Sequence, residues 1–283
     1  MILSTKQQFV DCLSINENSQ YVGTYKDLKL NSVFQPIFDH QDKVIGVEAL
    51  VRIQREGHGC VRPDLFFHSD QTDFDDKINV ERLSRVIHIR NFARSKYRHL
   101  QLFLNVLPSA GEYLAIESID SCLLNQRLRA LELSSSQIVM EVIELVASSE
   151  ENLRRAMGKL AENNFTIAVD DYGINASNQK RVEALRPGII KIDRTLMLSY
   201  MDGDKNGLLS SIKLAKKLNA KTVIEGIETQ EQLDAMRQLE IDMFQGYFLA
   251  MPAPLEVIHQ LATHDFEALS KQNVTNGDLN KLS

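Results

Sequence analysis

Short apolar runs that alternate with longer segments of helical periodicity constrain the fold of this 283-residue chain most strongly. Eight such runs are rich in Val, Ile, Leu and Phe, as buried β-strands are. They centre on residues 33–38, 44–52, 102–107, 138–144, 165–170, 188–193, 222–226 and 243–248. Strands separated by helices favour parallel pairing, and eight of them predict an α/β fold, a TIM-like (β/α)8 barrel.

The connection between the first two runs differs from the others. Only the residues from Asp39 to Lys43 join them. A parallel crossover needs a dozen residues or more, so this connection is too short for one. We therefore expect the first strand of the barrel to run antiparallel to the second.

Helix starts and domain limits are also visible in the sequence. Ser148 with Glu151, and Thr229 with Gln232, have the spacing of capping boxes. A further helix is expected over about residues 78–94, after a polar insertion at residues 54–77. We expect a polar, weakly patterned lead-in segment over residues 1–28, one barrel domain over residues 29–265 and a C-terminal tail over residues 266–283.

Composition excludes several classes of function. A net charge of -6 and a pI near 5.7 argue against a protein that tracks long nucleic acid, which needs clustered Lys and Arg. Cys12, Cys60 and Cys122 are odd in number and far apart, as is typical of reduced thiols. The chain has neither a run of ~18 apolar residues nor a secretory start. We expect a cytoplasmic protein with no membrane segment in this chain.

Polar side chains recur where the apolar runs end. Because the carboxyl ends of the strands of a parallel barrel lie on one face, these side chains are expected to share one site. The candidates are Glu48, Asn105, Glu141, Asp170, Asp171, Lys191, Glu225, Glu228 and Gln245.

The chemistry of these side chains indicates a metal site. So many carboxylates in one place would repel one another without cations, and none of the seven histidines falls at these strand ends. An oxygen-rich ligand set favours Mg²⁺ or Mn²⁺ over zinc. The adjacent Asp170 and Asp171 could bridge two ions, an arrangement that suits phosphoryl displacement by an activated water.

Individual residues also have structural explanations. Glu141 and Glu144 lie three apart and would face opposite sides of a strand, so at most one enters the mouth of the barrel. Lys191 and Asp193 share a face and could form a simple ion pair. Glu228 lies at a helix start, where an acid is favoured by the helix dipole.

Ordered motifs connect these positions. They are Gln35-Pro36-Ile37, Glu48-Ala49-Leu50-Val51-Arg52, Asn105-Val106, Glu141 with Glu144, Asp170-Asp171-Tyr172-Gly173, Lys191-Ile192-Asp193-Arg194, Glu225-Gly226-Ile227-Glu228-Thr229 and Gln245-Gly246-Tyr247. Over about residues 29–262 this series resembles the EAL-domain family of cyclic-di-GMP phosphodiesterases. The resemblance implies a barrel with an antiparallel first strand, and hydrolysis of cyclic-di-GMP to linear pGpG.

The resemblance also implies roles for the residues. Two Mg²⁺ or Mn²⁺ ions would be held, one by Glu48, Asn105, Glu141 and Asp170, the other by Asp170, Asp171 and Glu225. The attacking water and the phosphate would be positioned by Lys191 and Gln245. Glu144 would support the loop after the fifth strand, and Glu228 would lie behind the metal ligands or act as an auxiliary base. The nucleotide would contact Gln35, Leu50, Arg52 and Asp193, with the Arg52 guanidinium suited to a phosphate.

The resemblance implies cyclic-di-GMP and a second copy of the chain, bound through the loop after the fifth strand, as partners. A sensory domain or partner upstream is a further expectation. The loop after the fifth strand, residues Ile174 to Asn178, departs from the family pattern. A binding module without turnover is therefore an alternative. A Schiff-base aldolase that uses Lys191 is a third hypothesis, which the surrounding carboxylates disfavour.

Overall fold

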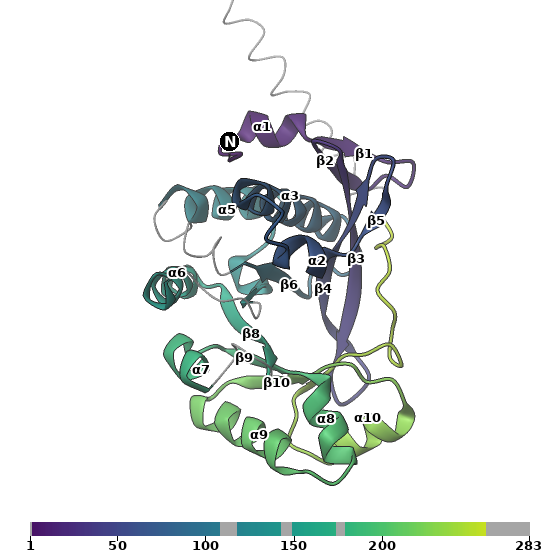
Figure 1. The fold of residues 1–283 in the computed structure, drawn as a ribbon, viewed down its shortest axis with the longest axis vertical. Coiled ribbons are helices and arrows are strands. Elements are labelled where there is room, and N and C mark those ends of the chain that lie inside the picture. Colours follow the sequence, from purple (N-terminus) through teal and green to yellow (C-terminus); the bar gives the residue numbers. More distant parts are fainter. Residues whose placement is uncertain (1, 108–117, 143–148, 174–178, 259–283) are drawn as a thin grey trace, which may run out of the picture.

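The computed structural model describes residues 2–107, 118–142, 149–173 and 179–258 (Figure 1). Eight of its strands close into a barrel, in the order β3-β11-β10-β9-β8-β7-β6-β4 and back to β3. These strands are β3 (Leu28–Phe38), β4 (Val44–Arg55), β6 (Gln101–Val106), β7 (Ile138–Val142), β8 (Thr166–Tyr172), β9 (Ile189–Ile192), β10 (Lys221–Ile224) and β11 (Met243–Phe244). The predicted TIM-like α/β barrel is confirmed.

The first barrel strand runs against all its neighbours. β3 pairs antiparallel with both β4 and β11, whereas every other neighbouring pair in the ring is parallel. The turn between β3 and β4 is closed by Asp39, whose Oδ1 accepts hydrogen bonds from the backbone N–H groups of Gln41 and Lys43 at 2.9 and 3.0 Å. The predicted reversal of this strand is therefore confirmed.

β3 and β4 extend well beyond the ring and carry three further strands. β2 (Tyr21–Tyr25) pairs with β3, β1 (Leu13–Ile15) pairs with β2, and β5 (Gly59–Val61) pairs with β4. The result is an antiparallel sheet that continues the barrel wall past the carboxyl end of β4, with the helix α1 (Lys6–Asp11) beside it (Figure 1).

The predicted polar, weakly patterned lead-in over residues 1–28 contains α1, β1 and β2. Phe9 and Tyr21 are buried in a cluster with Leu30 of β3 and with Val80 and Leu83 of the long helix that follows β5. The strands here are three and five residues long, too short to show a clear alternation in the sequence. The domain limits at residues 28 and 265 stay predictions, and the predicted tail over residues 266–283 lies outside the described residues.

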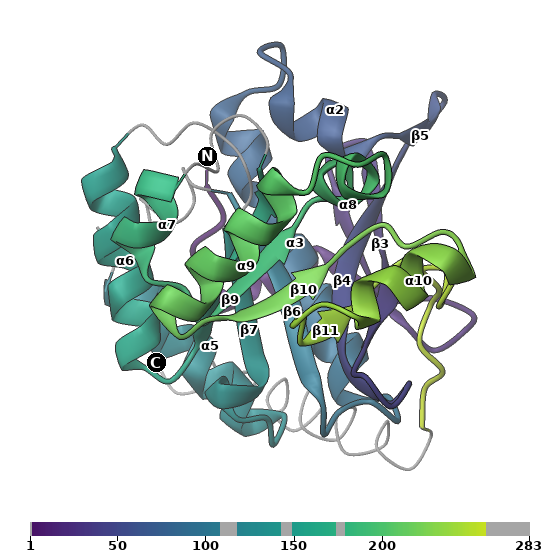
Figure 2. The same ribbon diagram turned by 90° about the horizontal axis from the view of Figure 1, so that it is seen from below.

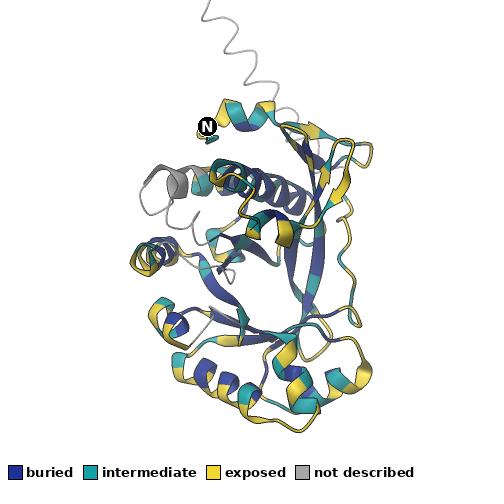
Figure 3. Ribbon diagram, viewed as in Figure 1, coloured by how far each residue is buried: buried dark blue, intermediate teal, exposed yellow. Residues whose placement is uncertain are grey.

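Helices surround the barrel. They are α2 (Pro63–His68), α3 (Phe74–Ala93), α5 (Ser118–Ala130), the 3-10 turn η1 (Ser135–Gln137), α6 (Glu150–Glu162), α7 (Gln179–Leu185), α8 (Arg194–Met201), α9 (Asn206–Leu218) and α10 (Gln230–Arg237). Figures 1 and 2 place α6, α7 and α9 outside the strands, and Figure 3 shows that each of these helices carries both buried and exposed residues.

The predicted helix starts are partly right. Thr229 and Gln232 form the expected capping box of α10. The cap of α6 is Ser149, whose side chain accepts a hydrogen bond from the Asn152 N–H, and the predicted cap Ser148 lies outside the described residues. α3 begins at Phe74, four residues before its predicted start. Asp73, with a ψ of 143°, is its N-cap residue, and the Lys77 N–H donates to the Asp73 carbonyl oxygen at 3.1 Å.

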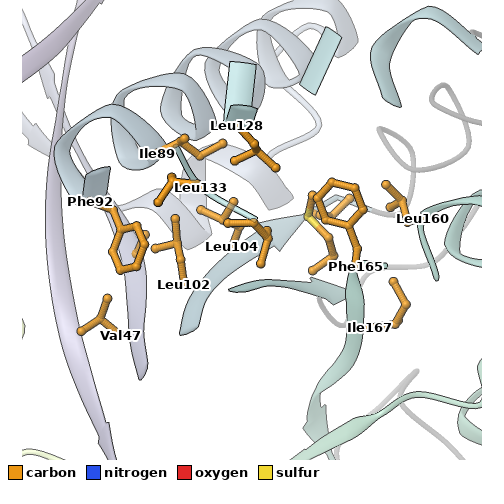
Figure 4. Close-up of a cluster of buried hydrophobic side chains, with 14 of the residues drawn as sticks. Val47, Ile89, Phe92, Leu102, Leu104, Leu128, Leu133, Leu160, Phe165 and Ile167 are labelled. Atoms are coloured by element: carbon orange, nitrogen blue, oxygen red, sulfur yellow. The ribbon is translucent and has the colours of Figure 1, made fainter. Parts of the chain in front are cut away.

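Two apolar layers hold the barrel together. Outside the strands, a cluster that includes Phe92, Leu104, Leu128 and Phe165 packs α3, α5 and α6 on the sheet (Figure 4). Inside the ring lies the lumen layer, which we define as Ile37, Phe103, Val139, Ala168, Ile189, Val223 and Met243. Within the described residues no helix is both long and apolar enough to cross a membrane.

Candidate active site

The candidate site residues stand directly above the lumen layer. Successive side chains of a strand point to opposite faces, so a residue two positions on lies on the same face, one step nearer the strand's end. This offset relates Gly46 to Glu48, Phe103 to Asn105, Val139 to Glu141, Ala168 to Asp170, Ile189 to Lys191, Val223 to Glu225 and Met243 to Gln245. The strand pleat itself therefore brings the predicted polar residues together at the mouth of the barrel.

Lys191 lies at the centre of this mouth layer. Its side chain is 1% exposed. Its Nζ lies 2.8 Å from Asp170 Oδ1, 2.8 Å from Glu225 Oε1, 3.0 Å from Glu141 Oε1 and 3.4 Å from Glu48 Oε2. One ammonium group thus contacts carboxylates from four strands or strand ends. The expected alternative, an ion pair between Lys191 and Asp193, is not how Lys191 is held.

Two amides complete the layer around Glu48. Asn105 Nδ2 donates to Glu48 Oε1 at 3.3 Å, and Gln245 Nε2 donates to Glu48 Oε2 at 2.9 Å. Gln35 lies opposite Glu48 in the β3–β4 ladder, and its Nε2 donates to the carbonyl oxygen of Ala250 at 3.2 Å. Glu48 therefore faces the mouth of the barrel, as predicted from its place at a strand end.

The ionisable groups of the mouth layer have shifted pKa values. Burial raises the pKa of Glu141 and of Glu225 well above the usual value, and raises that of Asp170, although Lys191 opposes the shift in each case. Burial disfavours the charge of Lys191, but Asp170, Glu141 and Glu225 outweigh it and raise the pKa of its ammonium well above the usual value. Four carboxyl groups therefore share a single buried cation.

A second carboxylate group lies beside Lys191. Oxygen atoms of Asp170, Asp171 and Glu225 lie within 4.8 Å of one another. In a regular strand the adjacent Asp170 and Asp171 would face opposite sides. Here the β8–β9 register shifts between Val169 and Tyr172, and Asp171 adopts a left-handed φ of 48°. This irregularity allows both aspartates to approach Glu225, as bulges near active sites do.

The donors fit divalent cations. All are carboxylate or amide oxygens, the ligands that Mg²⁺, Mn²⁺ and Ca²⁺ prefer. Two buried acceptor atoms, Glu141 Oε2 and Gln245 Oε1, have no hydrogen-bond partner in the part of the chain that the structure describes. Buried acceptors without a donor are costly, and a cation would satisfy them.

Other predicted residues lie further from Lys191. Asp193 caps α8 by accepting a hydrogen bond from the Thr195 N–H at 2.7 Å. Arg52 is exposed and donates to the backbone oxygen of Val51 at 3.1 Å. Leu50 and Arg52 share the inward face of β4 with Glu48. Glu144 and the loop from Ile174 to Asn178 lie outside the described residues.

Glu228 forms an ion pair that the sequence did not suggest. Arg194 Nη1 and Nη2 lie 2.7 and 3.1 Å from its two carboxylate oxygens. The partners belong to the segments that follow β9 and β10, neighbouring strands of the ring. Only the strand order gives this proximity, so a search for opposite charges just past neighbouring strands could have found it.

The fold and the mouth layer define an α/β barrel with one reversed strand and an acidic, lysine-centred site at its carboxyl-terminal rim. The EAL domain family matches residues 24–252. The chain belongs to the EAL domain family.

Curated relatives and a solved structure agree with this membership. The probable cyclic di-GMP phosphodiesterase PdeD of Escherichia coli K12 is 28% identical over 227 residues, which cover 78% of this chain and 41% of PdeD. The oxygen sensor protein DosP of the same organism is 26% identical over 235 residues, 81% of this chain and 29% of DosP. The chain therefore spans less than half the length of these relatives.

The solved structure is that of the Bacillus subtilis YkuI protein, with an EAL domain, in complex with substrate c-di-GMP and calcium. It superposes with a TM-score of 0.67 at 24% identity, over 90% of this chain and 65% of YkuI. At this identity the likeness supports the fold alone.

Proposed function

We propose that this chain hydrolyses cyclic-di-GMP to linear pGpG with the help of divalent cations. The observation that carries the proposal is Lys191, buried among Glu48, Glu141, Asp170 and Glu225 beside the close carboxylate group of Asp170, Asp171 and Glu225. Membership of the EAL domain family and relatives with cyclic di-GMP phosphodiesterase names support it.

The residues divide between two cation positions. Glu48, Asn105, Glu141 and Asp170 would hold one ion, and Asp170, Asp171 and Glu225 the other. Ions in these positions would supply a water of lowered pKa and neutralise phosphate charge in the transition state. In the overall reaction one water adds to phosphorus and the bond from phosphorus to one ribose 3′ oxygen breaks, which leaves a 5′ phosphate on pGpG.

The chain's own groups orient the reactants. The Lys191 ammonium keeps its proton at neutral pH, because its pKa is raised, and so it would donate hydrogen bonds to the water and to a phosphate oxygen. Gln245 and Gln35 present amides at the same mouth. Arg52 is exposed above Glu48 on the same face of β4 and could pair with a phosphate.

Product analysis tests this function directly. The purified chain is incubated with cyclic-di-GMP and Mn²⁺ or Mg²⁺, with and without chelator, and the nucleotides are separated by chromatography. We expect pGpG only with metal. Lys191→Met should lower the rate by about 10²- to 10⁴-fold. Lys217→Ala, which removes a surface ion pair with Glu183, is the matched control and should retain the rate.

The same experiment decides between hydrolysis and binding without turnover. The alternative is motivated by the loop from Ile174 to Asn178, whose sequence departs from the family pattern. Nucleotide that binds tightly in calorimetry and is recovered intact with either metal would replace the enzyme by a binding module. A borohydride-stable adduct at Lys191 would instead support the aldolase hypothesis.

The setting of the enzyme is part of the proposal. We propose that the chain forms a homodimer. We also propose a regulatory domain upstream, because the chain covers only 29% of a relative named as an oxygen sensor. The free thiols of Cys12 and Cys60 are compatible with the cytoplasm, the proposed location. Sedimentation of the purified chain, with and without nucleotide, tests the dimer.

A further inference from the structure

Arg194 and Glu228 form a two-point contact at the rim of the barrel. The two guanidinium nitrogens lie 2.7 and 3.1 Å from the two oxygens of Glu228, the paired geometry that fixes orientation as well as distance. Both side chains are about two fifths exposed, at 41% and 44%. Exposed ion pairs add little to global stability, so stability does not account for this contact.

The stem of Arg194 lies against the backbone of Gly226. Gly226 has a left-handed φ of 68°. A Cβ atom at this position would lie 2.7 Å from Arg194 Cβ and 3.1 Å from Arg194 Cδ. Contacts this short are not tolerated between ordinary side chains, so the approach requires glycine. Arg194 therefore spans the turn from Glu225 to Glu228. Its stem covers Gly226 and its guanidinium group binds Glu228.

The other side of this turn is held by the segment after β11. Ile227 N–H donates to the Gln245 carbonyl at 3.1 Å, and Phe248 N–H donates to the Ile227 carbonyl at 3.0 Å. Gly246 lies so close that a Cβ atom there would come within 2.3 Å of the Ile227 nitrogen. The turn is thus enclosed between Arg194 on one side and residues 245–248 on the other.

Glu225 begins the turn and enters the carboxylate group. Its backbone N–H continues the ladder to the Ile192 carbonyl at 3.2 Å, and its carboxylate contacts Lys191 and approaches Asp170 and Asp171. Three carboxylates this close together repel one another, which favours a position of Glu225 further from the other two. The contact between Arg194 and Glu228 restricts the backbone of the turn at its other end, and so restricts the movement of Glu225.

We infer that Arg194 is a positioning residue: by binding Glu228 and covering Gly226, it holds Glu225 in the carboxylate group and so sets the affinity of the site for a divalent cation. The inference rests on the proposed function only in that the cation position is the one assigned there. The exposed Arg194–Glu228 pair would then act indirectly, through the position of Glu225, and not by contact with the reacting groups.

The test compares both ends of α10. Arg194→Ala, Arg194→Lys and Glu228→Gln alter the contact near the start of this helix. Arg237→Ala is the matched control, because Arg237 pairs with Asp42 at the other end of α10, by the β3–β4 turn. Each purified variant is examined for Mn²⁺ affinity by calorimetry, for hydrogen exchange of residues 225–228 without metal, for thermal unfolding, and for kcat and KM with cyclic-di-GMP.

We expect Arg194→Ala to weaken Mn²⁺ binding about 10- to 100-fold, as loss of groups that orient metal ligands does. Exchange at residues 225–228 should accelerate, kcat should fall by a similar factor, and KM and the unfolding temperature should stay close to the parent values. Arg194→Lys should recover part of the affinity through a single contact. Arg194→Ala combined with Glu228→Gln should lose no more than either change alone, because both remove the same contact.

Unchanged Mn²⁺ affinity and unchanged exchange in Arg194→Ala would overturn the inference and leave the proposed function intact. An equal loss in Arg237→Ala would also overturn it, since the effect would then belong to α10 in general. Parent protein that binds Mn²⁺ but makes no pGpG would contradict the proposed function alone, because Mn²⁺ affinity and hydrogen exchange at residues 225–228 would still test the role of Arg194. Parent protein that binds no Mn²⁺ would contradict both the proposed function and the inference about Arg194.

Discussion

The lumen layer and the mouth layer are built by the same strands, two residues apart, and yet they have opposite properties. Phe103, Val139 and Val223 fill the lumen with apolar side chains that are fully buried. The next inward positions on these strands are Asn105, Glu141 and Glu225. Two residues along each strand, apolar side chains are therefore followed by polar or charged ones. The layer that stabilises the barrel lies directly below the layer that carries the candidate chemistry.

The mouth layer carries an energetic cost that the lumen layer does not. Four carboxylates surround Lys191, and the buried acceptors Glu141 Oε2 and Gln245 Oε1 have no hydrogen-bond partner within the described residues. Buried charge is tolerated when it is paired, and the pairing here is incomplete. Imbalance of this kind is typical of functional sites, where strongly shifted pKa values gather.

The largest expected effect comes from the lumen. Phe103 is among the largest fully buried side chains, and its ring fills the space left by Gly46, where a Cβ atom would lie 2.8 Å from it. Phe103→Ala should lower the free energy of unfolding by about 3–5 kcal/mol. Urea denaturation with chelator present measures this loss. A loss below ~1 kcal/mol would mean that the lumen layer does not carry stability.

The mouth should respond in the opposite direction. Glu141 is fully buried and shares one lysine with three other carboxylates. Glu141→Gln keeps the shape and removes a buried carboxylate that shares Lys191 with three others, so the metal-free protein should become more stable by about 1–3 kcal/mol. Mn²⁺ affinity should fall at the same time. Urea denaturation with chelator and calorimetry with Mn²⁺ check the two effects, and a destabilised, metal-free variant would contradict the comparison.

A smaller, pH-dependent effect should arise from a buried polar residue away from both layers. His88 of α3 is buried, with its Nδ1 2.8 Å from Ser32 Oγ. Burial, and secondly the charge of Arg52, lowers its pKa from the usual value of 6.5 to about 3. The neutral ring therefore contributes stability above pH 6.5, and this contribution is lost progressively as pH falls from 6.5 toward 3.

His88→Gln isolates that contribution. Below pH 6.5 the histidine protein should lose about 1 kcal/mol of stability per pH unit relative to the variant, and above pH 7 the difference between the two should be constant. Urea midpoints at pH 7.5 and 5.5 give the comparison. Parallel pH profiles would show that His88 takes up a proton in the folded state at no cost.

Much of the barrel follows from the sequence because its signals are local. The apolar runs, the short connection after Asp39 and the cap at Thr229 each depend on a few neighbouring residues. The strand ends were less predictable. β4 continues to Arg55 because β3 and β5 pair with it on both sides, and no single segment carries that information.

The candidate site shows the same limit. Strand alternation places Glu48, Glu141 and Lys191 on one face, and the structure brings them together. Alternation would put Asp170 and Asp171 on opposite faces, and the shifted β8–β9 register together with the left-handed φ of Asp171 overcomes this. The Arg194–Glu228 contact depends on the three-dimensional order of β9 and β10, which the one-dimensional pattern does not contain.

The reversed direction of β3 has a consequence for how the chain approaches its own mouth. In a ring of eight parallel strands the first strand would start at the far end of the barrel. Here β3 starts beside the end of β4, where Leu28 lies opposite Arg55, and the two strands that precede it are stacked on that same side. The segment in front of residue 28 therefore meets the barrel on the side of the carboxyl-terminal rim, seven residues along β4 from Glu48, rather than at the opposite end.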